Sequence, residues 1–174
     1  AAKFYHPMGI AIDGNHLYVA DSNNHKIRKI VIATGVVTTL AGSGSSGSTD
    51  GTGTSARFKE PYGMTTDGTN LYVADLGNHK IRKIVIATGA VTTLAGSGSY
   101  GFADGTGTSA KFNQPISITK DGTNLYVGDR SNHTIRKIVI ATGEETTYAR
   151  RTSSGSTDRD ATSARLNNQI ALTM

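Results

Sequence analysis

The sequence predicts an all-β protein, a β-propeller made of four-stranded antiparallel blades, with three blades in the chain. The chain repeats at a fixed offset of 54 residues, so that the string at 19–30 returns at 73–84 and again at 127–138. Each repeat contains short apolar runs joined by turn signals such as Asp-Gly, which are typical of β-hairpins. The inner strands are apolar on both faces, which indicates small sheets that are covered on both sides by radial stacking.

Each repeat is expected to form four strands, as the second repeat illustrates. An Asp-Gly turn at 67–70 joins the first strand to the second. Asp and Asn side chains at 75–79 bond the local backbone and so favour a turn before the third strand. A shorter turn at 87–89 precedes the fourth strand. The four strands are predicted at 62–66, 71–74, 80–86 and 90–95.

A long Gly- and Ser-rich linker, residues 96–115, follows the fourth strand of the second repeat. Thr108 and Ser109 resemble a helix N-cap, so we expect one helical turn over 108–112. Because hairpins alternate, the linkers share one face of the disc with turns of the 75–79 type. Long loops often carry function, so this face is the first place to look for binding. The phenylalanine near the end of each linker is expected to plug its blade: Phe4, Phe58 and Phe112.

The composition excludes several classes of site. There is no cysteine, so the chain has no disulfide, thiolate metal site or cysteine nucleophile. No stretch is long and apolar enough for a membrane span. The net charge of +5 permits binding of an anionic polymer, although solubility alone also accounts for it. The candidate basic face consists of the paired residues Arg28, Lys29, Arg82, Lys83, Arg136 and Lys137.

The repeated histidines and aspartates are interpreted as turn residues. His25, His79 and His133 would lie on separate rim turns, too far apart for one metal ion, and we expect local hydrogen bonds to satisfy them. The Asp-Gly aspartates would start tight turns, with a Ca²⁺-binding carboxylate collar as the alternative: Asp13, Asp67 and Asp121. We therefore predict no catalytic residue, metal ligand, cofactor or enzymatic activity.

The repeat boundaries divide the chain into three blades and a remainder. The blades are predicted at 1–54, 55–108 and 109–162. Residues 163–174 align with the start of the second and third repeats, so we interpret them as the orphan first strand of a further blade.

The motif Leu-Tyr-Val-Ala-Asp-x-x-Asn-His-x-Ile-Arg-Lys-Ile, with Val-Thr-Thr-Leu-Ala-Gly, resembles the NHL repeat, in particular the form found in large secreted bacterial proteins. The resemblance covers nearly the whole chain. It implies a propeller, commonly six-bladed, whose first strands line a central channel. It also implies a binding or scaffolding role more often than catalysis, and an extracellular or cell-surface location in a bacterium.

Three blades cannot close such a ring, so we expect self-association. Two chains would complete a six-bladed ring, or head-to-tail contacts would run on as a filament. The third repeat departs from the others near its end, where charges discourage edge pairing or form ion pairs between subunits. The candidate self-association residues are Glu144, Glu145, Arg150, Arg151, Arg159, Asp160, Leu166, Ile170 and Leu172.

The leading functional hypothesis is a non-catalytic propeller module that binds itself as a structural or protein-binding scaffold. Other extracellular proteins or anionic polymers are further candidate partners. One alternative is binding of RNA or an anionic polysaccharide on the basic face. A second alternative is a metal-dependent hydrolase or lyase with its site in the channel.

Overall fold

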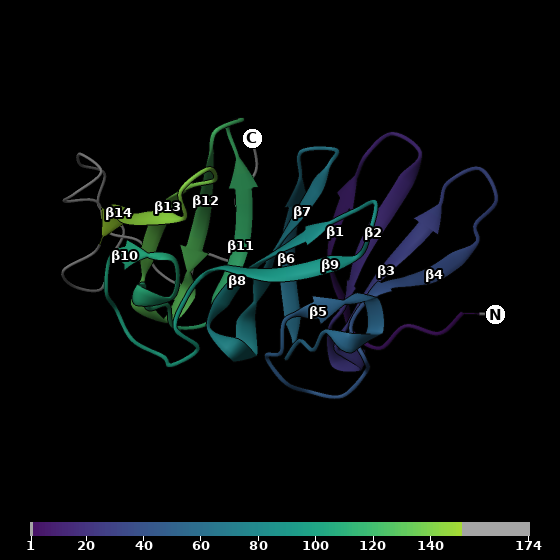
Figure 1. Ribbon diagram of the computed structural model, residues 1–174, viewed down its shortest axis with the longest axis horizontal. Coiled ribbons are helices and arrows are strands. Elements are labelled where there is room, and N and C mark those ends of the chain that lie inside the picture. The colour runs from purple at the N-terminus through teal and green to yellow at the C-terminus, as the bar shows by residue number, and fades with distance from the viewer. Residues whose placement is uncertain (1, 151–174) are drawn as a thin grey trace.

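The computed structural model describes residues 2–150 and contains three antiparallel sheets that lie side by side (Figure 1). The first blade contains strands β1 (Pro7–Ile12), β2 (His16–Asp21), β3 (Lys26–Val31) and β4 (Val37–Ala41), paired in that order. The second blade contains β6 (Pro61–Thr66), β7 (Asn70–Asp75), β8 (Lys80–Val85) and β9 (Ala90–Ala95). The third contains β11 (Pro115–Lys120), β12 (Asn124–Asp129), β13 (Thr134–Val139) and β14 (Glu144–Arg150).

The predicted all-β architecture of three four-stranded blades is confirmed. In the second blade no end of an observed strand differs from the predicted end by more than one residue. The orphan first strand predicted at 163–174 lies outside the described part of the chain.

The linkers contain more structure than the sequence predicts. The two-residue strands β5 (Gly51–Thr52) and β10 (Gly105–Thr106) pair with the outer strands β9 and β14 of the blade that follows them. Each is followed by a 3₁₀ helix, η2 (Gly53–Ser55) or η4 (Gly107–Ser109), so the helical turn expected at 108–112 begins earlier and is tighter. The linkers therefore tie neighbouring blades together.

Short 3₁₀ helices also form the turns between the second and third strands. These are η1 (Ser22–Asn24), η3 (Leu76–Asn78) and η5 (Arg130–Asn132). Each ends at a histidine in the left-handed conformation, with φ of 54° at His25, His79 and His133. As predicted from the hairpin order, these helices lie at the same end of the blades as the linkers (Figure 1).

The hydrophobic core consists of two seams between neighbouring blades. Tyr18 and Ile27 of the first blade pack against Phe58, Leu71 and Ile84 of the second. The second seam uses the same repeat positions one blade further on: Tyr72, Ile81, Phe112, Leu125 and Ile138. Each blade therefore has a leading face, which covers the preceding blade, and a trailing face, which is covered by the following one. This explains why the strands are apolar on both sides.

The first strands of adjacent blades approach very closely beside the channel. A Cβ atom at Gly9 would stand 2.2 Å from the carbonyl oxygen of Tyr62, and one at Gly63 would stand 2.5 Å from that of Ile116. Only glycine allows this separation between β1, β6 and β11. The third blade carries Ser117 at the same position.

Candidate functional site

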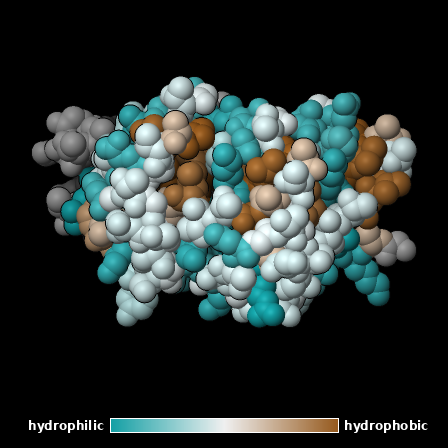
Figure 2. All heavy atoms as spheres, in the orientation of Figure 1, coloured by the Kyte–Doolittle hydropathy of each residue, from teal (hydrophilic) through white to brown (hydrophobic). Residues whose placement is uncertain are grey.

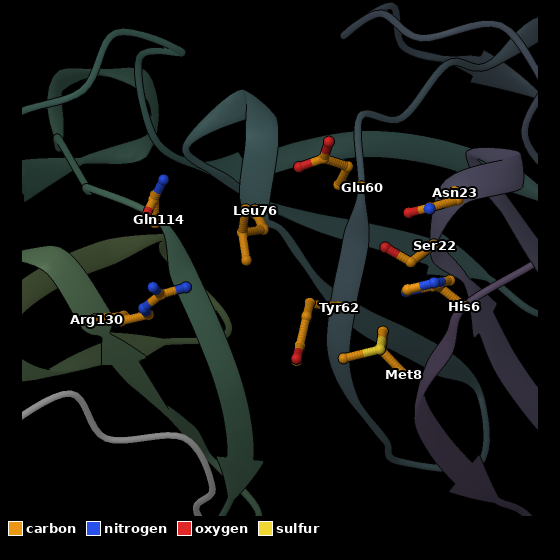
Figure 3. Close-up of a pocket in the computed structure, with 9 residues that line it drawn as sticks. All are labelled: His6, Met8, Ser22, Asn23, Glu60, Tyr62, Leu76, Gln114 and Arg130. Carbon is orange, nitrogen blue, oxygen red and sulfur yellow. The ribbon is translucent and has the colours of Figure 1, made fainter.

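A pocket of about 260 Å³ lies where the first strands of the three blades begin, beside the helices η1, η3 and η5. We call it the mouth pocket. All three blades contribute to its wall, and Figure 3 shows the side chains around one shared opening. Its nine lining residues are His6, Met8, Ser22, Asn23, Glu60, Tyr62, Leu76, Gln114 and Arg130.

The lining residues occupy the repeat positions that vary most within the chain. At seven positions the three repeats carry three different residues. In first-repeat numbering these positions are 5, 6, 8, 12, 22, 23 and 36. Every lining residue falls on position 6, 8, 22 or 23. Sequence reasoning missed this site because it treated the repeats as copies. A comparison of the three copies, position by position, identifies the residues of this pocket.

The backbone at the entrance of the pocket is strained and firmly held. His6, Glu60 and Gln114 have φ of 51°, 51° and 58° although none is a glycine and each precedes a proline, which disfavours this conformation. Such positions cost on the order of 1–3 kcal/mol each and cluster at functional sites. The amide N–H of Glu60 donates to Nδ1 of His25 over 3.2 Å.

The repeated histidines therefore connect blades, which differs from the expected local hydrogen bonding. His79 Nδ1 accepts the amide N–H of Gln114 at 3.1 Å, as His25 does for Glu60. Burial, together with the nearby Lys59 charge, lowers the pKa of His79, which keeps the ring neutral and able to accept. Within residues 2–150, the buried Nδ1 of His133 has no such partner.

The aspartates of the Asp-Gly turns serve the turns, as predicted. The Asp67 carboxylate accepts the amide N–H of Asn70 at 2.6 Å and the hydroxyl of Tyr72 at 2.8 Å. Although burial raises the pKa of Asp67, these hydrogen bonds lower it to about 2. The Asp121 carboxylate makes the same contacts with Asn124 and Tyr126. Within the described residues, no group of three or more histidines and carboxylates is arranged to hold a metal ion.

The basic face predicted from the sequence is wrong for its arginines. Arg82 and Arg136 are 0% exposed, and their guanidinium groups pair with the buried Asp75 and Asp129 at 2.8 and 3.0 Å. Arg28 pairs with Asp21 at 3.1 Å. A charge needs a partner in a low-dielectric interior, and each aspartate lies seven residues before its arginine on the neighbouring strand. Lys29, Lys83 and Lys137 of the predicted face are partly exposed.

The candidate self-association residues of the third blade fall into three groups. Glu144 and Arg150 are exposed on β14. Glu145 is only 1% exposed, and its carboxylate bonds the Arg136 guanidinium at 2.6 Å, so it is an interior residue of the third blade. The remaining candidates lie outside the described residues: Arg151, Arg159, Asp160, Leu166, Ile170 and Leu172.

Replacing Glu145 by valine, the residue found at Val37 and Val91, should stabilise the protein. Burial raises the pKa of Glu145 to about 7 against the opposing effect of Arg136. The native state therefore holds a proton that the unfolded chain releases near its ordinary pKa of 4.5, and stability falls as pH rises through this window. We expect the free energy of unfolding to rise by about 1–3 kcal/mol above neutral pH, and by less in acid, when measured by urea denaturation.

The matched control for this substitution is Glu144→Ala, which restores the repeat residue Ala90 at the exposed neighbouring position. It should leave stability nearly unchanged at both pH values, since exposed substitutions usually have small effects. A gain from Glu145→Val that does not depend on pH would contradict the assignment of a buried, proton-binding carboxyl.

Comparisons with known proteins agree with the repeat motif. The NHL repeat family model matches residues 4–30. Protein SUPPRESSOR OF QUENCHING 1, chloroplastic, from Arabidopsis thaliana is 36% identical over 157 residues, covering 82% of this chain and 15% of that protein. NHL repeat-containing protein 2 from Bos taurus is 35% identical, covering 81% of this chain and 22% of that protein. The chain thus spans 15% to 22% of the length of these relatives.

Solved structures share the fold at lower sequence identity. An auxiliary nutrient binding protein from Bacteroides ovatus aligns with a TM-score of 0.74 at 22% identity, covering 99% of this chain and 44% of that one. Virginiamycin B lyase from Staphylococcus aureus aligns with a TM-score of 0.56 at 18% identity, covering 84% and 42%. The described residues include no helix of the length and hydrophobicity that a membrane crossing requires. The repeat motif and the family match show that this chain carries NHL repeats, and the solved structures show that it shares the fold of β-propeller proteins.

Proposed function

We propose that the chain is a non-catalytic propeller module that associates with a second copy of itself, the leading face of each first blade covering the trailing face of the partner's third blade. The observation that carries the proposal is that these two open faces use the same repeat positions as the two seams inside the chain. Two copies joined in this way provide six blades, which closes the ring with the twofold symmetry common in oligomers.

The leading face of the first blade is open at positions that are buried elsewhere. Ile10 is 62% exposed, whereas Met64 and Ile118 at the same repeat position are 7% and 5% exposed. Leu17 and Ile30 are likewise partly exposed, and their counterparts in the other blades are buried. Figure 2 shows hydrophobic side chains gathered at the end of the molecule formed by the first blade. A continuous apolar face of this kind favours burial against a partner.

The trailing face of the third blade is open in the complementary way. Tyr126 and Ile135 are partly exposed, whereas Tyr18, Tyr72, Ile27 and Ile81 at the same repeat positions are fully buried. In the inner seams, the amide N–H groups of Glu60 and Gln114 donate to the preceding blade's histidine. Within residues 2–150, the buried Nδ1 of His133 has no such donor. In a second copy that donor is the amide of His6, so the seam supplies a hydrogen bond as well as apolar contact.

Ser117 sets a limit on how closely this seam resembles the inner ones. Its Cβ occupies the place where Gly9 and Gly63 allow the next strand to approach, so β11 and a partner's β1 must stand further apart than β1 and β6. The seam between copies therefore depends mainly on the outer strands, and its affinity is lower than a perfect repeat would give.

Substitutions on the open face test the proposal in analytical ultracentrifugation across a concentration series. The wild-type chain should form a dimer, and Ile10→Lys should be monomeric because it places a charge in the seam. Ser117→Gly should tighten association by roughly tenfold, because relief of overpacking typically recovers about 1–3 kcal/mol.

The matched control is Ile12→Lys, which introduces the residue found at Lys120 and lies outside the buried seam positions, so it should still dimerise. A wild-type chain that stays monomeric at submillimolar concentration would overturn the proposal. A ladder of ever larger species would replace the closed ring by a head-to-tail filament.

We further propose an extracellular, bacterial setting, supported by the fold shared with the Bacteroides nutrient binding protein.

A further inference from the structure

We propose that the linkers between the blades carry a binding surface for an acidic polysaccharide, formed by cationic side chains that lie across them. We call this surface the basic strip, and its residues are Lys26, Arg57, Lys80, Lys111 and Arg150. None of them belongs to the basic face predicted from the sequence. Both linkers lie at the same end of the blades (Figure 1), and the whole strip belongs to one chain, so this inference does not depend on self-association.

Three cations gather on a short segment of the first linker, residues 44–48. The Lys26 stem lies across position 44, where a Cβ atom would stand 3.0 Å from its Cε. The Arg57 stem lies across position 47, where a Cβ atom would stand 2.8 Å from its Cδ. The ammonium nitrogen of Lys80 lies 3.3 Å from Oγ of Ser48. The fold thus brings cations from β3, β8 and the end of the linker to one segment.

The second linker continues the strip. The Lys80 stem also lies against position 98, where a Cβ atom would stand 3.1 Å from its Cε, so this lysine contacts both linkers. The Lys111 stem lies across position 101 as Arg57 lies across position 47. The Arg150 guanidinium lies 4.1 Å from the ring centroid of the neighbouring Phe102. The cations therefore follow one another along the linkers and form a row.

Glycine at the crossing points makes room for the cationic stems. Positions 44, 47, 98 and 101 are all glycine, and a side chain there would compete with the stem that crosses it. The methylene groups cover the linker backbone while the charged heads remain in water. The exposed residues are Arg57, Lys111 and Arg150, and the partly exposed ones are Lys26 and Lys80. Stems that are already packed lose less conformational freedom when a ligand binds.

The strip has no counter-charge of its own in the described part of the chain. Within residues 2–150, none of its five side chains forms an ion pair. The linker carboxylates of Asp50 and Asp104 are paired with the interior Arg82 and Arg136. Glu60, an exposed acid at this end, lines the mouth pocket. A polyanion along the linkers would supply the missing negative charge and release the counterions that the cations hold.

The chemistry of the linkers favours an acidic polysaccharide. A flexible chain with an acid group on successive sugar units fits a row of cations without requiring one fixed distance between them. Single-stranded nucleic acid binds best where successive aromatic rings offer free faces for stacking. The Phe102 ring already carries the guanidinium groups of Arg150 and Arg136, at 4.1 and 4.7 Å from its centroid. Exposed hydroxyl groups that can bond sugar hydroxyls come from Ser45, Ser46 and Ser48.

The experiment is fluorescence anisotropy of labelled oligogalacturonate titrated with the chain across a salt series. The comparison ligands are a neutral maltodextrin of the same length and an oligouridylate of the same number of charges. We expect oligogalacturonate to bind, and its affinity to fall at least roughly tenfold as salt rises from about 50 to about 200 mM. The maltodextrin should not bind, and the oligouridylate should bind more weakly than oligogalacturonate.

Variants assign the binding to the strip. Lys80→Thr introduces the residue of Thr134 at the same repeat position and should weaken oligogalacturonate binding about threefold. Adding Arg57→Gln should bring the loss to roughly tenfold. The matched control is Lys120→Thr, which copies Thr66 and removes one positive charge at the opposite end of β11. It should bind normally, and all variants should keep the circular dichroism spectrum of the wild type.

Three results would overturn the proposal. The first is the absence of oligogalacturonate binding to the folded wild-type chain at the lowest salt. The second is an equal loss of affinity in Lys120→Thr and Lys80→Thr, which would mean that only net charge matters. The third is tighter binding of oligouridylate than of oligogalacturonate, which would assign the strip to nucleic acid.

Discussion

Replacement of Asp75 by alanine is expected to lower the free energy of unfolding by about 3–5 kcal/mol. Asp75 and Arg82 are both 0% exposed, and removing the carboxylate leaves a buried guanidinium without its buried counter-charge. The aspartate also accepts hydrogen bonds from the amide of Lys59 at 2.9 Å and from Asn78 at 2.8 Å. Both donors lose their acceptor in the variant, which adds to the cost.

The substitution should also weaken the linker, because Arg82 binds both Asp75 and the linker. Its guanidinium donates to the carbonyl oxygens of Arg57 and Thr49 and pairs with the linker carboxylate of Asp50 at 2.7 Å. Asp50 in turn accepts the amide N–H of Thr93 on β9, so one arginine connects the linker to the blade that follows. We therefore expect the variant to lose protection of linker amides in hydrogen exchange as well as global stability.

The matched control is Asp21→Ala in the first blade. Arg28 keeps 14% of its side-chain surface exposed, so water partly solvates the charge that the substitution leaves behind. The expected loss is about 1–3 kcal/mol in urea denaturation followed by circular dichroism. Equal losses for the two variants, or a loss below about 1 kcal/mol for Asp75→Ala, would contradict a buried ion pair that holds the linker.

The blades were predictable because their signals are local. Asp67 and Gly68 define a hairpin whose turn is completed within four residues, and the apolar positions of β7 and β8 identify a doubly covered sheet without any long-range information. Hairpins of this kind depend on contacts between neighbours in the sequence. This locality explains why the strand limits agree so closely with the expectation.

The interior arginines and the linkers were not predictable in the same way. Arg82 looks like a surface residue in the sequence, because its pair with Asp75, seven residues away, forms only across two strands and its partners Asp50 and Arg57 lie 32 and 25 residues away. The strand β5 has only two residues and forms because β9 offers an open edge, which leaves no propensity signal. His25 was expected to bond locally, whereas its partner Glu60 lies 35 residues away in the next blade. Long-range polar contacts thus account for the errors.

The mouth pocket was hidden for a different reason. Its residues are of mixed type and follow no known motif, so only the arrangement of blades brings His6, Glu60 and Gln114 to one opening. The information was present in the sequence as disagreement among the repeats at these positions. In a repeat protein, agreement among copies reports the scaffold, and disagreement at adjoining positions reports the site.

Phe58→Ala is expected to destabilise the seam between the first two blades by about 3–5 kcal/mol. The Phe58 ring is 0% exposed, packs in the first core cluster and lies 5.1 Å from the Arg82 guanidinium. Its removal leaves a cavity and also removes the aromatic face beside the buried cation, which contributes about 0.5–2 kcal/mol in such contacts. Urea denaturation measures the total loss.

Phe4→Ala supplies the control, because Phe4 holds the same repeat position at the open leading face and is partly exposed. There the surrounding groups are already in contact with water, so the expected loss is about 1 kcal/mol. Phe4 lies at a similar distance, 5.4 Å, from the Arg28 guanidinium, so both variants lose a cation–aromatic contact. The difference in stability between the two variants therefore reports the burial of the ring.

The distribution of the damage in Phe58→Ala distinguishes a stack of blades from a single cooperative core. In a stack, each blade is stabilised by its nearest neighbours, so the first blade should open while the second and third remain joined through Phe112 and Ile138. Amides of β2 and β3 should then exchange far faster than in the wild type, and those of β12 and β13 should change little. Uniform acceleration in all three blades would mean that the seams unfold together, and that a weakened end cannot open without the rest of the chain.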